Sequence, residues 1–399
     1  MKSASLLAAA TAATASVLEL PVRVQDTYSS VGFSVGTPPK PYWLLFDTGS
    51  STAWITNTAC TEASCPNPRP YSRTGYSANA SSTSQDLHSF TRIPFIDGDG
   101  VAGAATLDVF STPDSSFEWN QTFLSVNQSS WRWITADGFL GLGFSSIAEN
   151  KTSSLVETLL WDGKLDEPRF GLFYGTDFAN DADHNGVLTI GGSEEEKYVD
   201  GEVVYVPLRK EDPYQLWRAP LRSINILVAG QQNATVIMKT GSLPDTTDAE
   251  GVWPKYNTTW PTYGTAVFDT GAGRISLPTE NIAAVYFNLG WNITKLMNGE
   301  ERMDCQHLNA SWALTFTLGE SVDESDDISF SIRGDEFTEP GGECMPPFDD
   351  SQGYGFALIG ATFLTRYYSV YDFGASKVEE YAPRIGFGRL KKEWDWLYQ

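Results

Sequence analysis

A short motif occurs twice in this 399-residue chain, and its repetition limits the folds that the sequence can adopt. An apolar run leads into Asp-Thr-Gly at Asp47 and again at Asp269. A hydrophobic segment with a glycine follows each copy, DGFLGLG with Gly141 and ALIGATF with Gly360. Gly141 lies 94 residues after Asp47, and Gly360 lies 91 residues after Asp269. This spacing indicates a duplicated protein with two lobes, each of which holds one copy of both elements.

Most of the chain has the pattern of β structure. Short runs of Val, Ile, Phe, Tyr and Thr alternate with clusters of Gly, Asn, Asp, Pro and Ser, which is typical of strands joined by turns. Helical patterns are confined to two short segments, 153–164 and 278–290. The length suits two domains of ordinary size. We predict an all-β-dominated chain of two pseudo-symmetric lobes, residues 16–206 and 207–399, with a cleft between them.

The two aspartates favour hydrolytic chemistry. Apolar strands can bring Asp47 and Asp269 into the interior, and Gly49 and Gly271 allow a sharp turn after each. Two carboxyl groups that lie close together share one proton, because ionising both is costly. The ionised group can then take a proton from a bound water while the protonated group donates to a substrate carbonyl. This chemistry requires no metal, no cofactor and no covalent intermediate.

These features resemble the pepsin family of aspartic proteases over nearly the whole chain. The first loop reads D-T-G-S-S-x-x-W from Asp47 to Trp54, and RIGFGRL at 384–390 resembles the last strand of a sheet that lies beneath both lobes of that family. The resemblance implies a bilobal endopeptidase in which Asp47 and Asp269 are catalytic. The side chains expected to support them are Thr48, Ser50, Trp54 and Thr270.

The same resemblance implies where substrate binds. Segment 93–103 matches the hairpin flap that closes over substrate, with Phe95 where the family usually has tyrosine. Phe95 lacks the hydroxyl that would bond to Trp54, while Phe95 and Phe139 favour large apolar side chains at the scissile bond. The expected substrate contacts are Gly49, Phe95, Asp97, Gly98, Phe139, Gly271 and Ala272.

The two loops differ in one hydroxyl. Ala272 replaces the hydroxyl residue that commonly follows the second D-T-G, whereas Ser50 follows the first. We therefore expect the Asp269 carboxylate to be less stabilised than that of Asp47.

Four cysteines, an even number, predict disulfides in an oxidising compartment. Three pairings are open, and proximity in the chain favours Cys60–Cys65 and Cys305–Cys344, which also match two disulfides of the family. The cysteines form no CxxC motif, and the histidines at positions 88, 184 and 307 are scattered. We therefore expect no metal site.

Several features predict secretion. Residues 1–15 combine one lysine, an apolar stretch and an A-x-A ending, as in a signal peptide. No later apolar run is long enough to span a membrane, and the polar C-terminus argues against a lipid anchor. About five residues separate the expected cleavage site from the first strand-like residues at Pro21, so we expect no inhibitory prosegment. Eight N-x-Ser/Thr sequons suit a glycosylating route, at Asn79, Asn120, Asn127, Asn150, Asn233, Asn257, Asn292 and Asn309.

The charge narrows the range of partners. A formal net charge of −23 argues against nucleic acid and anionic membranes as partners. The charge suits a protein that works in acid, and it would equally well serve only to keep the protein in solution. We expect a monomer that acts on proteins or peptides. A second hypothesis is a pepsin-fold binding or inhibitor protein without turnover, which the missing prosegment and Phe95 favour. A carbohydrate-active enzyme with two carboxylates is a third, but it does not explain the repeated D-T-G loops.

Overall fold

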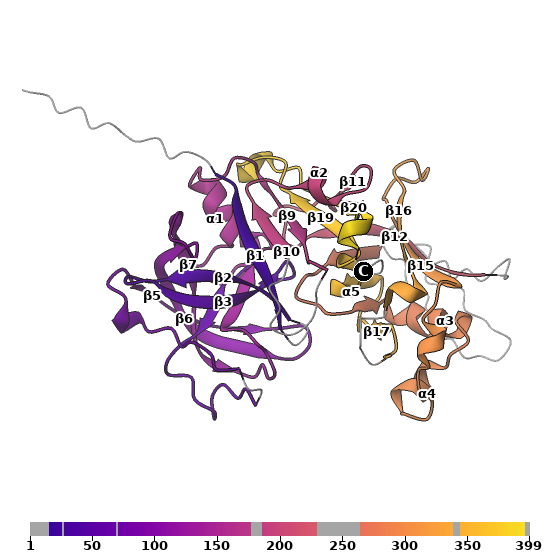
Figure 1. The fold of residues 1–399 in the computed structure, drawn as a ribbon, viewed down its shortest axis with the longest axis horizontal. Helices are drawn as coiled ribbons and strands as arrows, with labels where there is room; N and C mark the ends of the chain where they lie inside the picture. The colour runs from indigo at the N-terminus through magenta and orange to yellow at the C-terminus, as the bar shows by residue number, and fades with distance from the viewer. Residues whose placement is uncertain are drawn as a thin grey trace, which may run out of the picture.

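The computed structural model describes residues 16–25, 28–68, 71–176, 186–229, 264–337 and 344–395. The expected signal peptide, residues 1–15, and the sequons at Asn233 and Asn257 lie outside these ranges. Figure 1 shows two lobes of β structure, one coloured indigo to magenta from the first half of the chain and one mainly orange from the second. The architecture confirms the mostly β, two-lobed fold that the duplicated motif predicts.

The strands of the described residues form two sheets. The larger sheet contains β1 (Leu18–Gln25), β2 (Tyr28–Val35), β3 (Lys40–Asp47), β4 (Trp54–Thr56), β5 (Gln85–Pro94), β6 (Gly100–Ser111), β7 (Glu118–Ser129), β8 (Gly138–Gly141), β9 (Arg169–Phe173), β10 (Gly186–Ile190), β11 (Val204–Pro207), β19 (Tyr367–Asp372) and β20 (Arg384–Arg389). Its strand order is β11-β20-β19-β9-β10-β1-β2-β3-β8-β4-β7-β6-β5. The smaller sheet contains β12 (Arg218–Val228), β13 (Gly264–Phe268), β14 (Ile275–Leu277), β15 (Trp312–Leu318), β16 (Ile328–Arg333), β17 (Phe348–Asp350) and β18 (Phe356–Ile359). Its order is β16-β15-β12-β13-β18-β14-β17.

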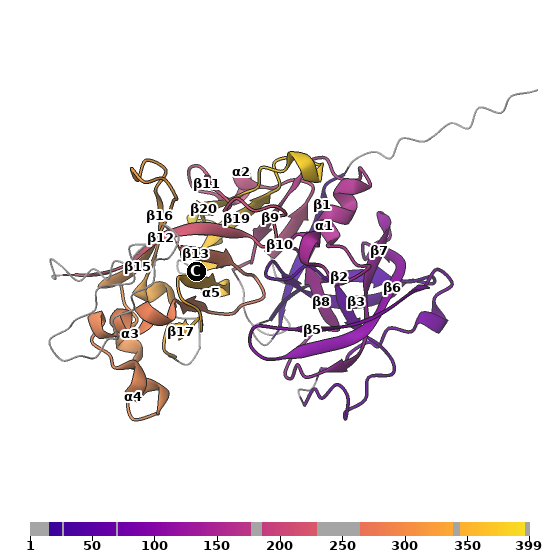
Figure 2. The same cartoon turned by 180° about the vertical axis from the view of Figure 1, so that it is seen from behind.

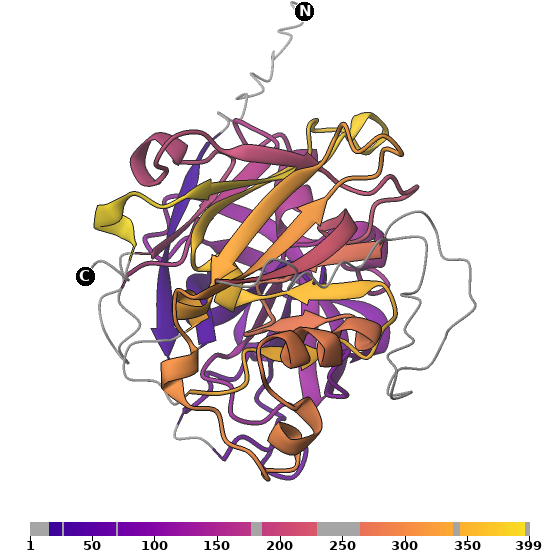
Figure 3. The same cartoon turned by 90° about the vertical axis from the view of Figure 1, so that its right-hand side faces the viewer.

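Helices are short and lie outside the sheets. The two helical segments that the sequence predicts are present as α1 (Leu155–Trp161) and α3 (Thr279–Asn288). The other α-helices in the described part of the chain are α2 (Glu195–Tyr198), α4 (Ile293–Met297) and α5 (Ala361–Leu364). Short 3-10 helices lie at Ala78–Ala80, Ser145–Ile147, Cys305–His307, Gly334–Phe337, Val378–Glu380 and Lys392–Trp394. Figure 3 shows the second lobe from its outer side, with its orange helices below its strands.

Each lobe builds its aspartate loop from the same arrangement of three strands. In the first lobe β3 runs parallel to β8, which runs antiparallel to β4. In the second lobe β13 runs parallel to β18, which runs antiparallel to β14. The register places Asp47 opposite Gly141 and Phe268, which precedes Asp269, opposite Ile359. The two repeated sequence elements are therefore neighbouring strands in each lobe.

Strands from both halves of the chain join the lobes. β19 pairs antiparallel with β9 and with β20, and β1 pairs antiparallel with β10. Figure 2 shows these strands in the upper middle of the molecule, between the lobes. The RIGFGRL segment forms β20, in agreement with the resemblance. The expected lobe boundary at residues 206–207 falls within β11, which also pairs with β20.

A buried tryptophan connects the second half of the chain to the first aspartate loop. Trp217 is fully buried and packs on Phe144 and Phe373, with ring centroids 4.9 Å and 5.0 Å away. Its Nε1 donates to the Leu142 carbonyl at 2.8 Å, and the Leu142 amide donates to the Asp47 carbonyl at 2.8 Å. Packing between the lobes therefore fixes the backbone beneath Asp47.

The structure contains the two favoured disulfides. Cys60–Cys65 closes a small loop after β4, and Cys305–Cys344 joins a 3-10 helix to the segment before β17. Each bridge lies within a single lobe.

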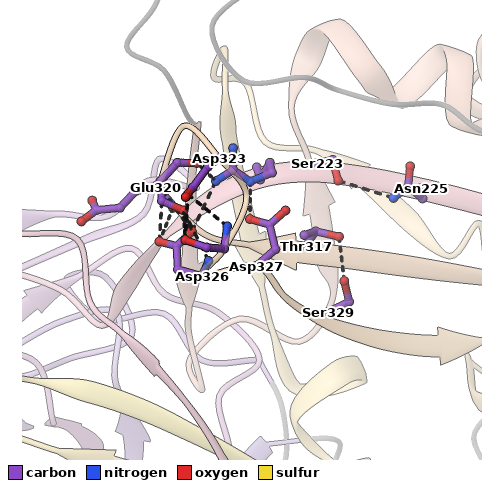
Figure 4. A network of polar contacts seen from close by, with 11 residues as sticks. Ser223, Asn225, Thr317, Glu320, Asp323, Asp326, Asp327 and Ser329 are labelled. Atoms are coloured by element: carbon purple, nitrogen blue, oxygen red, sulfur yellow. Dashed lines mark hydrogen bonds and ion pairs between the residues drawn. The ribbon is translucent and has the colours of Figure 1, made fainter.

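The turn between β15 and β16 is rich in acidic side chains, several of which Figure 4 shows. Asp326 accepts from the backbone amides of Glu320 and Ser321 at 3.0 Å each. Arg222 pairs with Asp327, and its Nη2 donates to the Ser321 carbonyl at 2.6 Å. These acidic side chains therefore accept hydrogen bonds and form ion pairs that stabilise the turn itself.

Candidate active site

The two aspartate loops face each other and exchange hydrogen bonds through their threonines. The Thr48 amide donates to Thr270 Oγ1 at 3.0 Å, and the Thr270 amide donates to Thr48 Oγ1 at 2.9 Å. Each hydroxyl also donates to the opposite strand, Thr48 Oγ1 to the Phe268 carbonyl at 2.8 Å and Thr270 Oγ1 to the Phe46 carbonyl at 3.0 Å. Both threonines are buried, so these bonds hold the loops in register.

The glycine of each loop lies against the carboxyl group of the other loop. A Cβ atom on Gly49 would stand 2.3 Å from Asp269 Oδ2, and one on Gly271 would stand 2.6 Å from Asp47 Oδ1. No other residue type fits at such distances. The glycines are therefore needed for the close approach of the two aspartates, and the backbone turn is a second reason for them.

The glycines of the supporting segments make equally close contacts. A Cβ on Gly141 would stand 2.2 Å from the Ser51 carbonyl carbon, and one on Gly360 would stand 2.3 Å from the Ala272 carbonyl oxygen. The two repeated segments therefore pack directly under the two aspartate loops.

The carboxyl groups of Asp47 and Asp269 interact through a side-chain hydrogen bond. Burial raises the pKa of Asp47, and hydrogen bonds from the Ser50 hydroxyl, from Asp269 and from the Gly49 amide oppose this rise. The Ser50 hydroxyl and the Gly49 amide donate to Asp47 at 2.5 Å and 2.8 Å. Asp47 is therefore the better stabilised anion of the pair.

Asp269 has fewer donors. Its pKa is raised well above the usual value because burial removes water from the carboxyl group, and the charge of Asp47 and the hydrogen bond between the two carboxyls raise it further. The Gly271 amide donates to Asp269 Oδ1 at 2.8 Å, but Ala272 offers no hydroxyl corresponding to that of Ser50. Asp269 is therefore the less stabilised anion of the pair, in the direction that the sequence predicts.

The flap is a hairpin formed by β5 and β6. Its turn is closed by the Phe95 amide, which donates to the Asp99 carbonyl at 2.8 Å, and by Gly98, whose φ of 91° favours glycine. The Phe95 ring packs on Trp131 and Phe139, with centroids 5.3 Å and 5.8 Å away. The flap therefore rests on an aromatic cluster beside the aspartates.

Trp54 lies beneath this cluster. Its ring stacks on Phe139 with centroids 4.8 Å apart, and its buried Nε1 has no hydrogen-bond partner among the described residues. The indole thus retains an unused donor in the region where a tyrosine hydroxyl was expected to bond.

A cavity of 780 Å³ lies between the flap and the aspartates. The predicted site residues that line it are Asp47, Gly49, Ser50, Phe95, Asp97, Phe139, Asp269, Thr270, Gly271 and Ala272. Thr48 and Trp54 lie behind this lining, and Gly98 lies in the flap turn outside it.

Sequence reasoning missed several lining residues. Some lie next to the motifs, namely Leu45, Ile93 and Arg274, and others lie further away, namely Tyr28, Trp131, Ile147, Glu149 and Asp349. Trp131 precedes the DGFLGLG segment by a few residues, so its proximity to Phe139 was a usable signal. Glu149 and Asp349 had none, because no catalytic or substrate-binding motif surrounds them.

Within the described ranges, no group of three or more His, Cys, Asp or Glu side chains could hold a metal ion. In the same ranges, every helix is too short or too polar to cross a membrane.

Comparison with known proteins agrees with this geometry. A family model of eukaryotic aspartyl proteases matches residues 28–382. The chain is 28% identical over 353 residues to the probable vacuolar protease A of Trichophyton verrucosum, covering 86% of this chain and 76% of that protein. It is 24% identical over 352 residues to embryonic pepsinogen of Gallus gallus, covering 86% and 78% of the two chains. With gastricsin of Rattus norvegicus the identity is 24% over 367 residues, covering 91% and 83%. The chain therefore belongs to the eukaryotic aspartyl protease family and is an aspartic-type endopeptidase.

Proposed function

We propose that Asp47 and Asp269 hydrolyse peptide bonds by activating one water molecule between them. The observation that carries the proposal is the contact between two buried carboxyl groups, of which Asp47 accepts from the Ser50 hydroxyl while Asp269 is followed by Ala272 at the corresponding place. Asp47, with the Ser50 hydroxyl and the Gly49 amide as donors, is the ionised base. Asp269 carries the shared proton and is the acid.

The reaction follows from these two states. The water oxygen attacks the carbonyl carbon of the peptide bond as one of its protons moves to Asp47. Asp269 gives its proton to the carbonyl oxygen. Together these steps form a tetrahedral intermediate with two hydroxyl groups on the former carbonyl carbon. The C–N bond then breaks as Asp47 returns its proton to the nitrogen and the intermediate returns one to Asp269. A carboxylic acid, an amine and the original pair of aspartates remain.

We propose an acidic working range for this reaction. Activity requires that Asp47 is ionised while Asp269 is protonated, so it falls when the pair holds two protons and when it holds none. Acid also brings the net charge of −23 closer to zero, which lowers the repulsion within the fold.

The aromatic wall of the cavity supports a preference for large apolar residues at the scissile bond. Phe95, Trp131 and Phe139 contact one another, and Leu45 lies in the same lining. Covering this wall with an apolar side chain removes nonpolar surface from water on both partners.

We further propose that the protein is secreted, as the signal-like residues 1–15 and the sequons indicate. Relatives include proteins named vacuolar proteases, so the location requires a direct test. Glycosylated protein in the culture medium is the expected result, and retention in the vacuole would contradict it.

Asp47→Asn and Asp269→Asn test the reaction. Each amide is nearly isosteric with the carboxyl group but cannot exchange the proton, so hydrolysis of an unfolded protein in acid should fall by at least about 10²-fold. A statine-type inhibitor, whose hydroxyl replaces the water, should bind the wild type tightly. A wild type that binds proteins without cleaving them would instead support the binding-protein hypothesis.

A further inference from the structure

One stretch of the cleft wall combines apolar side chains with a carboxylate. Thr52, Ile93, Ile147 and Glu149 all line the cavity. Ile93 belongs to the flap strand β5, while Ile147 ends a 3-10 helix two residues before Glu149. Ile147 is 38% exposed, so its side chain is available for contact with a bound peptide.

Glu149 is held firmly at this position. Its backbone amide donates to Thr52 Oγ1 at 2.8 Å, and its carbonyl accepts from Thr152 Oγ1 at 2.7 Å. Its carboxylate accepts from Thr91 Oγ1, on the flap strand, through Oε2 at 2.6 Å. The other oxygen, Oε1, has no hydrogen-bond or ion-pair partner among the described residues.

Among the described residues, the cations of the cavity lining and of the adjoining segments do not pair with this carboxylate. Arg274, a guanidinium in the cavity lining, pairs with Asp349 at 3.1 Å. The Lys151 Nζ donates to the Leu87 carbonyl at 2.5 Å and forms no ion pair with Glu149 within the described ranges. Arg92 is exposed and lies on the opposite face of β5 from Thr91, since successive strand side chains alternate.

We infer that Glu149 is a specificity-determining residue that selects a lysine or arginine side chain of the substrate beside the apolar residues of the scissile bond. Lysine and arginine have an apolar stem and a charged end. The stem would pack on Ile93 and Ile147, and the charged end would reach Glu149 Oε1. This inference rests on the proposed function, because it concerns the substrates of the same cleft.

The test is a positional scan of peptides. One neutral peptide with an apolar scissile pair receives lysine at each flanking position in turn, and each lysine peptide is compared with its norleucine counterpart, which keeps the stem but not the charge. All assays run at one fixed pH within the active range. At one position kcat/KM should be about fivefold higher for lysine, as for a single solvent-accessible ion pair. Added salt should reduce this preference.

Three variants separate charge selection from a structural role. Glu149→Gln keeps an acceptor for Thr91 but removes the charge, so it should abolish the lysine preference and leave norleucine peptides unchanged. Thr91→Val removes the hydrogen bond but keeps the charge, so the preference should remain. Glu196→Gln, an exposed change on α2, should alter neither.

Two results would overturn the inference. Cleavage with no lysine preference at any position, or a preference that survives in Glu149→Gln, would overturn it alone. Failure to cleave any peptide would overturn the proposed function and this inference with it.

Discussion

The hydrogen bonds that Thr48 and Thr270 make between the lobes allow a quantitative prediction about the free energy of unfolding. Thr48→Val removes a hydroxyl that donates to the Phe268 carbonyl at 2.8 Å and accepts from the Thr270 amide at 2.9 Å. The change leaves the buried Thr270 amide without its acceptor and the buried Phe268 carbonyl without its donor. Each lost bond costs about 1 kcal/mol, and a buried group left unsatisfied costs about 1–3 kcal/mol. With two such groups, we therefore expect the free energy of unfolding to fall by about 2–6 kcal/mol.

Urea unfolding of wild type and Thr48→Val measures this loss. Thr270→Val is the matched variant, because its hydroxyl makes the corresponding pair of bonds to Thr48 and Phe46. Each hydroxyl makes two of the four hydrogen bonds, and no bond involves both hydroxyls. The free energy of unfolding should therefore fall by a similar amount in each variant. Both variants should also lose kcat, since the aspartates depend on this register. A loss below about 0.5 kcal/mol in both variants, the range of ordinary surface changes, would refute the reasoning.

Three further predictions follow from the site and its charges. Gly49→Ala should abolish hydrolysis, because the added Cβ would stand 2.3 Å from Asp269 Oδ2; peptide turnover checks this, and an active variant would show that the loops can separate. Phe95→Tyr should be tolerated and should raise kcat, since its hydroxyl can accept from the unpartnered Trp54 Nε1; a large loss of turnover would mean that the ring needs a wholly apolar surrounding. The free energy of unfolding should fall as pH rises from about 4 towards 7, because carboxyl groups whose pKa burial raises hold protons in the fold that the unfolded chain has lost. Exposed carboxyls with a lowered pKa, such as Asp114, act in the opposite direction, and urea melts that show stability rising through this window would contradict the balance. The groups with a raised pKa include Asp47, Asp97, Asp137, Asp269, Glu280 and Asp349.

The aspartate loops could be predicted from the sequence because a local pattern determines them. Asp47 and Asp269 each end an apolar strand, and the repetition implies that they meet. The inequality of the two carboxyls also follows from one local difference, Ser50 against Ala272. The contact of Gly49 with Asp269 could not be predicted, since a motif in one loop does not show which atoms of the other loop it touches.

The other residues of the cleft lining could not be predicted, because their positions depend on the path of the chain between the motifs. Trp131 and Glu149 reach the cavity from connections, and Asp349 reaches it from the three-residue strand β17, which is too short to show a pattern. Such side chains leave no periodic signal, because loops lack the regular spacing of strands and helices. Gly98 was expected to contact substrate, but the hairpin turn places it outside the cavity lining, since a tight turn directs only some of its residues inward.

The contact between the two aspartate loops has the symmetry of a homodimer within one chain. Thr48 touches the second loop as Thr270 touches the first, which is the reciprocal pattern of an interface about a twofold axis. Two identical subunits could build such a contact, but their aspartates would then be equivalent. Joining the halves in one chain makes the association intramolecular and independent of protein concentration. It also lets each half change alone, so that one loop can keep a serine where the other has alanine and the proton has a preferred side.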